Sequence, residues 1–316
     1  MLLRIYILVV FGIFLLVPAT KSLAKSVEKS AGNICPPEEQ KALTSNNLEA
    51  ASFGISEDQV VILFPQGDLY PFNIADPHRV GFSIQYLDYT ESEIPDAGDN
   101  RFYLKAGGNI GIFRVENSCD PDHGWQLNII GSIDAMFDID HSLDNIGWDG
   151  NYGFTLTVAP HSNWKYKTGM LHTSSHLGDE YIERTGTART GYTRHEWMFG
   201  VSRLLTNEWR LYGESGYGFD LGNTDLMEPW RFQGGIEFVS EKKVLKGLAN
   251  WYATIDIQSW EESDWDFDVS SQIGMEIFSA GRRARLGIEY YEGRVPIGEF
   301  FQYYENYISL GFWVDI

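Results

Sequence analysis

The sequence has few cysteines, few prolines and few basic residues. It contains 2 Cys and 11 Pro in 316 residues, and its 24 Lys and Arg against 44 Asp and Glu give a formal net charge of −20. Binding to nucleic acid requires a basic face, and this chain is strongly acidic, so we predict no nucleic-acid partner. Beyond the N-terminus, no segment approaches the roughly 18–20 consecutive apolar residues that a membrane-spanning helix requires.

The N-terminus has the features of a secretory signal peptide. Arg4 precedes an apolar core from Ile5 to Pro18, and small residues follow from Ser22 to Ala24. This core is too short for a spanning helix, and we expect residues 1–24 to be cleaved after export. The mature chain then begins near Lys25.

Aromatic residues, in contrast, are abundant. They make up 15% of the chain, with 10 Trp and 17 Tyr, and glycine is frequent. An exported, acidic, aromatic-rich chain without long apolar runs is typical of a transmembrane β-barrel, in which only alternate residues face lipid.

Period-two alternation supports this fold class. In "WQLNIIGSIDAMF", Trp125, Ile129 and Ile133 share one face, whereas Asn128 and Asp134 share the other. Many such runs reach about 10 residues, which is the length that a tilted strand needs to cross a bilayer. Strands of soluble proteins are usually shorter, about 5–6 residues.

We therefore predict an all-β chain that forms a transmembrane antiparallel β-barrel of about twelve strands over residues 79–316. The expected strands are 79–89, 101–115, 125–139, 151–160, 163–175, 193–204, 207–219, 228–239, 249–260, 264–278, 282–292 and 304–316. Short turns such as "LTNEW" alternate with longer loops, as in bacterial outer-membrane barrels, where the short turns are periplasmic. The predicted location is the bacterial outer membrane, with its lipid as a partner.

Residues 25–78 are expected to form a periplasmic segment that lies beneath the barrel or enters it as a plug. Cys35 in this segment and Cys119 in a predicted periplasmic connection are on the same side, so we predict a disulfide between them. A reactive thiol is the alternative. The C-terminal strand, "SLGFWVDI", resembles the signal that outer-membrane assembly machinery reads, which predicts that machinery as a second partner.

Charged residues of both signs fall on the inward face of the predicted strands. They are Lys165, Lys167, Arg194, Glu196, Arg210, Glu214, Arg231, Glu237, Arg283, Arg285 and Glu289. Buried charges must be paired, so we expect these long side chains to fill much of the lumen with ion pairs. This favours a mostly filled interior over a wide pore.

Two stretches resemble a bacterial family known only as domain of unknown function 1207. They are "LYPFNIADPHRVGFSIQY" (Leu69 to Tyr86) and "HTSSHLGDEY" (His172 to Tyr181), followed by Arg189, Tyr192 and Arg194. The resemblance covers most of the mature chain and implies an outer-membrane β-barrel of undefined activity. It supplies no catalytic residues.

The stretch "LHTSSHLGDEY" contains the candidate site. Lys165 and Lys167 should face inward, because a lysine that faces lipid costs a few kcal/mol near the midplane. His172 and Ser174 then lie outward at the outer rim, where they could act as general base and nucleophile on an acyl ester of a surface lipid.

A carboxylate would have to orient the imidazole. The His-x-Ser spacing is similar to that of outer-membrane phospholipase A and the lipid A deacylases, which place a third polar residue about a dozen positions after the serine. That position here is Gly186, which cannot serve. Asp179 and Glu180 are the candidate third members, Glu183 is a further one, and His176 and His195 are candidate binding residues; His195 is also a candidate third member.

Other interpretations remain open. Ser, His and Asp at a rim satisfy strand ends and meet water, so the barrel could be non-enzymatic, either a narrow channel or a surface-interaction scaffold. His172, His176 and Asp179 or Glu180 could bind zinc, but no second cluster supports a metal site. The acidic loop "HSLDNIGWDGN" could hold Ca²⁺ weakly but lacks an EF-hand pattern, so we predict no cofactor.

Overall fold

The computed structural model describes residues 59–161, 163–279 and 282–315. The predicted signal peptide and Cys35 lie outside the described residues, so the cleavage and the Cys35–Cys119 disulfide stay predictions. Cys119 lies in the turn that joins β3 to β4. Thirteen strands are present among the described residues: β1 Gln59–Leu63, β2 Phe82–Ser92, β3 Asn100–Asn117, β4 Asp120–Asp138, β5 Asp144–His161, β6 Trp164–Leu177, β7 Thr193–Leu204, β8 Trp209–Leu221, β9 Trp230–Val239, β10 Asn250–Trp260, β11 Phe267–Ser279, β12 Arg282–Arg294 and β13 Tyr304–Asp315.

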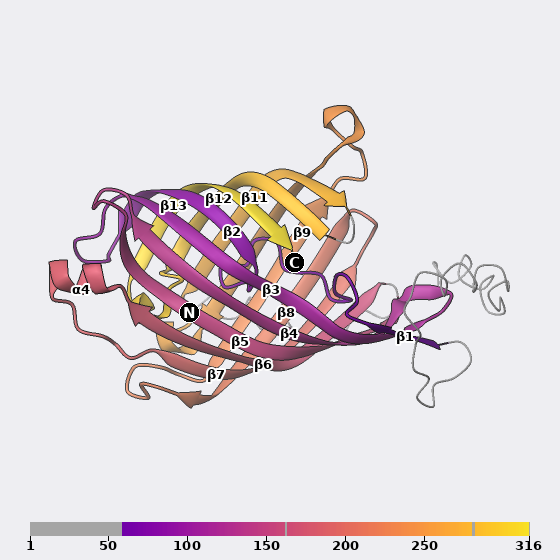
Figure 1. The fold of residues 1–316 in the computed structure, drawn as a ribbon, viewed down its shortest axis with the longest axis horizontal. Coiled ribbons are helices and arrows are strands. Elements are labelled where there is room, and N and C mark those ends of the chain that lie inside the picture. The colour runs from indigo at the N-terminus through magenta and orange to yellow at the C-terminus, as the bar shows by residue number, and fades with distance from the viewer. Residues whose placement is uncertain (1–58, 162, 280–281, 316) are drawn as a thin grey trace, which may run out of the picture. The chain divides into compact units, whose positions relative to one another are not determined.

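Strands β2 to β13 form a closed antiparallel barrel. Each strand pairs with the next along the chain, and β13 pairs with β2 to close the ring. The strands wrap obliquely around the barrel in Figure 1, with helix α4 (Asp179–Thr185) at one end and β1 at the other. We call these the α4 end and the β1 end. The prediction of a twelve-stranded antiparallel barrel is confirmed.

Some predicted boundaries are wrong. Residues 116–124, expected to be a loop, instead extend β3 and β4 into a hairpin with a two-residue turn, and β1 pairs with β3 on this extension. Strand β5 begins at Asp144, although 140–150 was expected to be a loop. The acidic loop after β6 contains α4, which Gly186 ends in the left-handed conformation, with a φ of 70° that glycine adopts without strain. Backbone pairing and capping thus order segments whose polar composition predicted loops.

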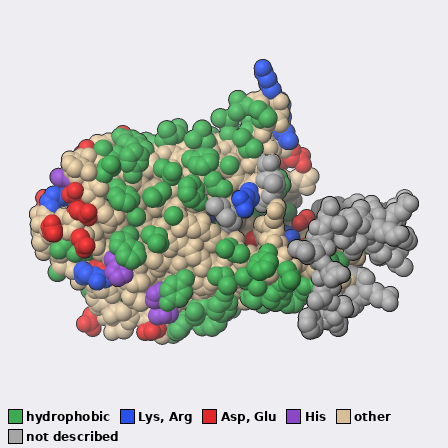
Figure 2. Space-filling view, in the orientation of Figure 1, with side chains coloured by type: hydrophobic (Ala, Val, Ile, Leu, Met, Phe, Trp, Pro, Cys, Tyr) green, Lys and Arg blue, Asp and Glu red, His purple; other side chains and the backbone are tan. Residues whose placement is uncertain are grey.

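The alternation places apolar side chains outside. Ile129, Ile133 and Ile273 each expose more than half of their surface, whereas Asn128 and Asp134 on the other face of β4 are buried. Figure 2 shows apolar side chains spread along the side of the barrel, and acidic side chains gathered at the α4 end. Within the described residues, no helix is long and apolar enough to cross a membrane.

The interior is charged and paired. Of the predicted inward charges, all but Lys167 and Arg283 are buried. Glu196 accepts from Arg194 at 2.8 Å and from Arg231 at 2.6 Å, and a Cβ at Gly216 would overlap the Glu196 carboxylate. The small residue therefore leaves room for the ion pairs that compensate the burial of charge.

Residues Pro65 to Val80, which we call the inner segment, contact the inner wall of the barrel. Asp68 accepts from Thr157 at 2.8 Å, Asn73 donates to Glu214 at 2.7 Å, and the backbone N–H of Ile74 donates to Glu237 at 2.7 Å. These partners lie on β5, β8 and β9, so the segment crosses the lumen.

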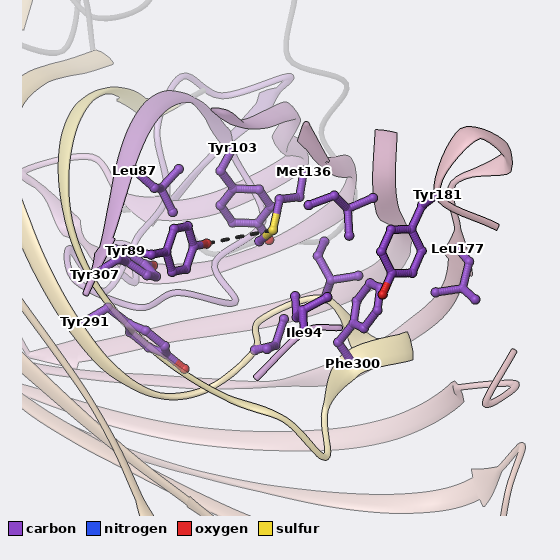
Figure 3. Close-up of a cluster of buried hydrophobic side chains, with 13 residues drawn as sticks. Leu87, Tyr89, Ile94, Tyr103, Met136, Leu177, Tyr181, Tyr291, Phe300 and Tyr307 are labelled. Carbon is purple, nitrogen blue, oxygen red and sulfur yellow. Dashed lines mark hydrogen bonds between the residues drawn. The ribbon is translucent and has the colours of Figure 1, made fainter. Parts of the chain in front are cut away.

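A hydrophobic cluster closes the α4 end. Tyr181 of α4 and Phe300 of the β12–β13 connection pack edge to face, with ring centroids 5.5 Å apart, against buried side chains of the barrel wall (Figure 3). Tyr89 donates a hydrogen bond to the Met136 sulfur at 3.8 Å in the same cluster. A cavity of about 130 Å³ remains beside the inner segment, lined in part by residues of the β12–β13 connection. The inner segment and this cluster therefore occupy part of the space inside the described barrel.

Candidate functional site

The predicted histidines and Ser174 lie on two neighbouring strands, β6 and β7, near the α4 end. His172 faces His195 directly across β6 and β7, and the same row continues to Tyr152 on β5 and Asp220 on β8. His172 has the parity of Tyr166, which is 43% exposed, and the opposite parity to the buried Lys165, so its side chain points outward. Histidine side chains are visible on the outside of the barrel in Figure 2.

The row forms a chain of polar contacts. The Nδ1 of His172 lies 2.9 Å from the Nε2 of His195, and the Nδ1 of His195 lies 3.4 Å from the Oδ2 of Asp220. At 3.4 Å the second contact is not a hydrogen bond, and the Nδ1 of His195 has no hydrogen-bond partner among the described residues. The ring of Tyr152 lies 4.4 Å from that of His172 and covers its other side. His172 is thereby largely covered although it points outward.

The charge of Asp220 favours one arrangement of protons in this row. The Asp220 carboxylate is an acceptor, so it favours a proton on the Nδ1 of His195 and leaves the His195 Nε2 as an acceptor. His172 must then donate from its Nδ1 to His195. The Nε2 of a neutral His172 consequently carries a free lone pair, which is the form that a general base requires.

Ser174 lies two residues beyond His172 on the same strand face. Its hydroxyl oxygen is 3.3 Å from the Nε2 of His176, and the Nδ1 of His176 is 2.9 Å from the Nη2 of Arg189. A guanidinium only donates, so the Nδ1 of His176 accepts and its Nε2 carries the proton. His176 therefore donates to Ser174 and cannot take its proton, while the serine's own hydrogen remains free to be donated elsewhere.

The structure differs from the sequence expectation in the partners of Ser174 and His172. We expected His172 to bind Ser174 directly, but among the described residues Ser174 bonds to His176, and His172 bonds to His195. For His172 the reason is distance, because side chains directly opposite on paired strands are about 4.5–5.5 Å apart at Cβ, closer than residues i and i+2 of one strand. Ser174 bonds instead to its other i±2 neighbour on the same strand, His176.

Asp179 and Glu180 are not brought to His172. Both lie exposed in the first turn of α4, and neither has a hydrogen bond to His172 or Ser174 in the described part of the chain. Tyr181 anchors that helix over the barrel mouth, because its side chain is buried and its hydroxyl donates to the Pro95 carbonyl at 2.8 Å. The carboxylates of Asp179 and Glu180 lie at the N-terminus of the helix, where their negative charge stabilises the helix through its dipole.

Two residues of the arrangement, Asp220 and Arg189, are not predicted from the sequence as parts of a site. Asp220 reaches the row through the pairing of β7 and β8, which is irregular between His195 and Glu196, and this register cannot be read from residue spacing. Arg189 was noted only as part of the family resemblance, yet its Nη2 also donates to the Ser175 carbonyl at 3.1 Å. Among the residues that the structure describes, no group of three His, Cys, Asp or Glu side chains could hold a metal ion.

A family model described as "Protein of unknown function (DUF1207)" matches residues 17–314. The chain belongs to the DUF1207 family. This confirms the resemblance carried by Leu69 to Tyr86 and His172 to Tyr181. No curated protein matches this DUF1207 chain.

Solved structures similar to this DUF1207 protein include outer-membrane barrels. The Salmonella typhi outer membrane phospholipase (OMPLA) dimer with bound calcium is 12% identical, with a TM-score of 0.49, over 78% of this chain and 94% of that one. Outer membrane phospholipase A from Escherichia coli is 12% identical, with a TM-score of 0.46, over 76% and 93%. The KdgM porin is 8% identical, with a TM-score of 0.38, over 74% and 99%. At this level of identity, the likenesses carry no information on the activity of the DUF1207 protein.

Proposed function

We propose that this protein is an outer-membrane barrel that hydrolyses acyl esters of surface lipids, with Ser174 as the nucleophile and His172 as the general base. The observation that carries the proposal is the row Asp220–His195–His172, in which the Nδ1 of His172 lies 2.9 Å from the Nε2 of His195 and the Asp220 carboxylate lies 3.4 Å from the other nitrogen of His195. The carboxylate favours a proton on the Nδ1 of His195, so that His172 donates to His195 and keeps its Nε2 as an acceptor. A base that a third group orients in this way, beside a hydroxyl nucleophile, is the recurring arrangement of serine hydrolases.

The apolar exterior supports a location in a membrane. The outward faces of the barrel strands expose large aliphatic and aromatic side chains along their length, as outer-membrane barrels do toward lipid. The short turns at the β1 end would then face the periplasm, and the longer connections at the α4 end would face outward. His172 and Ser174 would lie at the outer rim, about level with lipid head groups.

The proposed reaction uses only groups of this chain and water. The Ser174 oxygen attacks the carbonyl carbon of the ester while the Nε2 of His172 takes the serine proton. The tetrahedral intermediate then expels the alcohol, which receives that proton, and leaves an acyl group on Ser174. Water, deprotonated by the same imidazole, attacks the acyl-serine and releases the fatty acid, which restores the hydroxyl.

One movement is required before the attack. The Ser174 oxygen rests on His176, and in the described residues no hydrogen bond joins it to His172. A rotation about the χ1 angle of Ser174 directs its hydrogen toward His172, and bonds of this kind often tighten only when substrate binds.

A non-enzymatic scaffold is the second candidate. The inner segment crosses the lumen and the hydrophobic cluster packs at the α4 end, which favours a closed barrel over a narrow channel. A closed barrel presents its rim and loops as the surfaces that act, whether on lipid or on another partner.

The test compares wild type with Ser174→Ala and His172→Ala, purified in detergent and assayed on phospholipid and lipopolysaccharide. We expect each variant to lower kcat by at least about 10³-fold, because nucleophile and base act as a unit. Thr90→Ala is the matched control, since Thr90 is an exposed hydroxyl near the end of β2, away from the strands of the site, where it bonds to Asn306, and it should leave activity unchanged. Equal activity in wild type and Ser174→Ala would refute the hydrolase and leave the scaffold.

A further inference from the structure

We propose that His176 is a catalytic residue that donates a hydrogen bond to the oxyanion of the tetrahedral intermediate on Ser174. The inference rests on the proposed hydrolase function and adds a role that the nucleophile and base do not fill. The anionic oxygen that forms when an ester carbonyl is attacked needs a donor that is in place beforehand, and removing such a donor typically costs about 10²–10³ in kcat.

The hydrogen-bond partners of His176 decide what it can do. Arg189 approaches the Nδ1 of His176 at 2.9 Å and can only donate, so the proton of a neutral His176 resides on Nε2. That N–H points at the Ser174 oxygen, 3.3 Å away. His176 is therefore a fixed donor at the nucleophile, and the same contact prevents it from acting as the base.

The ring of His176 is also held in orientation. Trp148, which faces it across β5 and β6, stacks on the imidazole with centroids 4.4 Å apart and an interplanar angle of 21°. Arg189 is itself fixed, because its Nη2 donates to the Ser175 carbonyl at 3.1 Å and its Nε lies 3.5 Å from the buried carboxylate of Glu299. A donor held by a stacked ring and by Arg189 requires little reorganisation when negative charge develops.

The two histidines then have different roles: His172 accepts the serine proton and His176 donates to the oxyanion. The row with Asp220 leaves His172 with a free lone pair at Nε2, whereas Arg189 leaves His176 with an N–H at Nε2. Ser174 lies between them in sequence on one strand face, so an acceptor for its proton and a donor for the oxyanion flank it. Arg189 is a positioning residue in this scheme, because it acts through the tautomer of His176.

The test uses the full-length protein in detergent micelles, with p-nitrophenyl hexanoate as the ester and a fluorophosphonate that labels active serines. His176→Leu removes the donor and should lower kcat about 10²–10³-fold while KM changes little. His176→Gln keeps an N–H donor and should retain more of the activity than His176→Leu. Arg189→Met frees the imidazole to adopt either tautomer and should give an intermediate loss.

The pH profile separates a donor from a base. If His172 is the base, the acid limb of the kcat profile keeps its midpoint in His176→Leu, and a lost acid limb would show that His176 takes the proton instead. Thermal unfolding of each variant, with Thr90→Ala as the control, shows whether a loss of activity follows from a loss of fold.

The two proposals fail in different ways. Wild type that neither hydrolyses the ester nor reacts with the fluorophosphonate at Ser174 overturns the hydrolase, and the oxyanion donor with it. Wild type that does both, beside an inactive Ser174→Ala and a fully active His176→Leu, overturns only the role of His176. Equal losses in His176→Gln and His176→Leu would also contradict a donor role.

Discussion

At the scale of single residues, the register between strands determines which side chains meet. The sequence correctly predicts that Ser174 and His172 share an outward face, because alternation along one strand depends only on parity. It does not predict that His172 contacts His195. That contact depends on the register between β6 and β7, which the length and structure of the connection between them determine. Asp220 is further removed, because an irregularity in the β7–β8 pairing sets its position.

The contacts of His172 with His195, and of His195 with Asp220, predict different losses when each of these two residues is substituted. His195→Phe removes the acceptor for the Nδ1 of His172 while it keeps a ring, and we expect kcat to fall about 10²–10⁴-fold, as when other hydrolases lose the group that orients the base. Asp220→Asn should cost much less, because the Asp220 side chain is 72% exposed and its contact to His195 is 3.4 Å long. Steady-state kinetics on the same ester measure both losses. A larger loss in Asp220→Asn than in His195→Phe would contradict the order of the row.

At the scale of elements, the inner segment determines whether the barrel conducts. Arg210 of β8 holds this segment, because it pairs with Glu237 at 2.8 Å and donates to the carbonyls of Pro71 and Phe72 and to the side chain of Asn73. Burial, with the positive charge of Arg294 nearby, holds the pKa of His78 well below its usual range. His78 is therefore neutral at pH 7, and it hydrogen-bonds to Gln258 at 3.1 Å. These contacts join the segment to the wall on several strands.

Substitution of Arg210 should loosen this segment. In planar bilayers we expect wild type to conduct little or nothing, because the inner segment crosses the lumen. Arg210→Ala leaves Glu237 buried without its partner, which typically costs about 3–5 kcal/mol, and should raise the conductance as the segment detaches. Arg203→Ala is the control, since Arg203 on the adjacent β7 contacts the ring of Trp164 outside the ion-pair network. Large, steady conductance in wild type would contradict a closed barrel.

At the scale of the whole molecule, the sequence predicts the barrel well because its alternation repeats twelve times. Each strand of the closed ring was expected within a few residues, and the exceptions have physical causes. The strands β4 and β5 begin earlier than expected because polar residues of the loops join the ladder at both ends of the barrel. Helix α4 was missed because seven residues are too few for periodicity to reveal, and its one buried side chain, Tyr181, belongs to a cluster that exists only in three dimensions.

The outward apolar face makes the last prediction, which concerns the membrane itself. Ile273 lies midway along β11 and is 58% exposed, and its neighbours in register, Ala253 and Ile288, are uncharged. In phospholipid vesicles, Ile273→Lys should reduce the free energy of unfolding by about 2–4 kcal/mol, the cost of a lysine at the bilayer midplane. Tyr290→Lys is a comparison nearer the end of β12, beside Glu292, where the same charge should cost less. Urea unfolding of both variants in the same vesicles measures the difference, and equal costs at the two positions would mean that no hydrocarbon layer contacts Ile273.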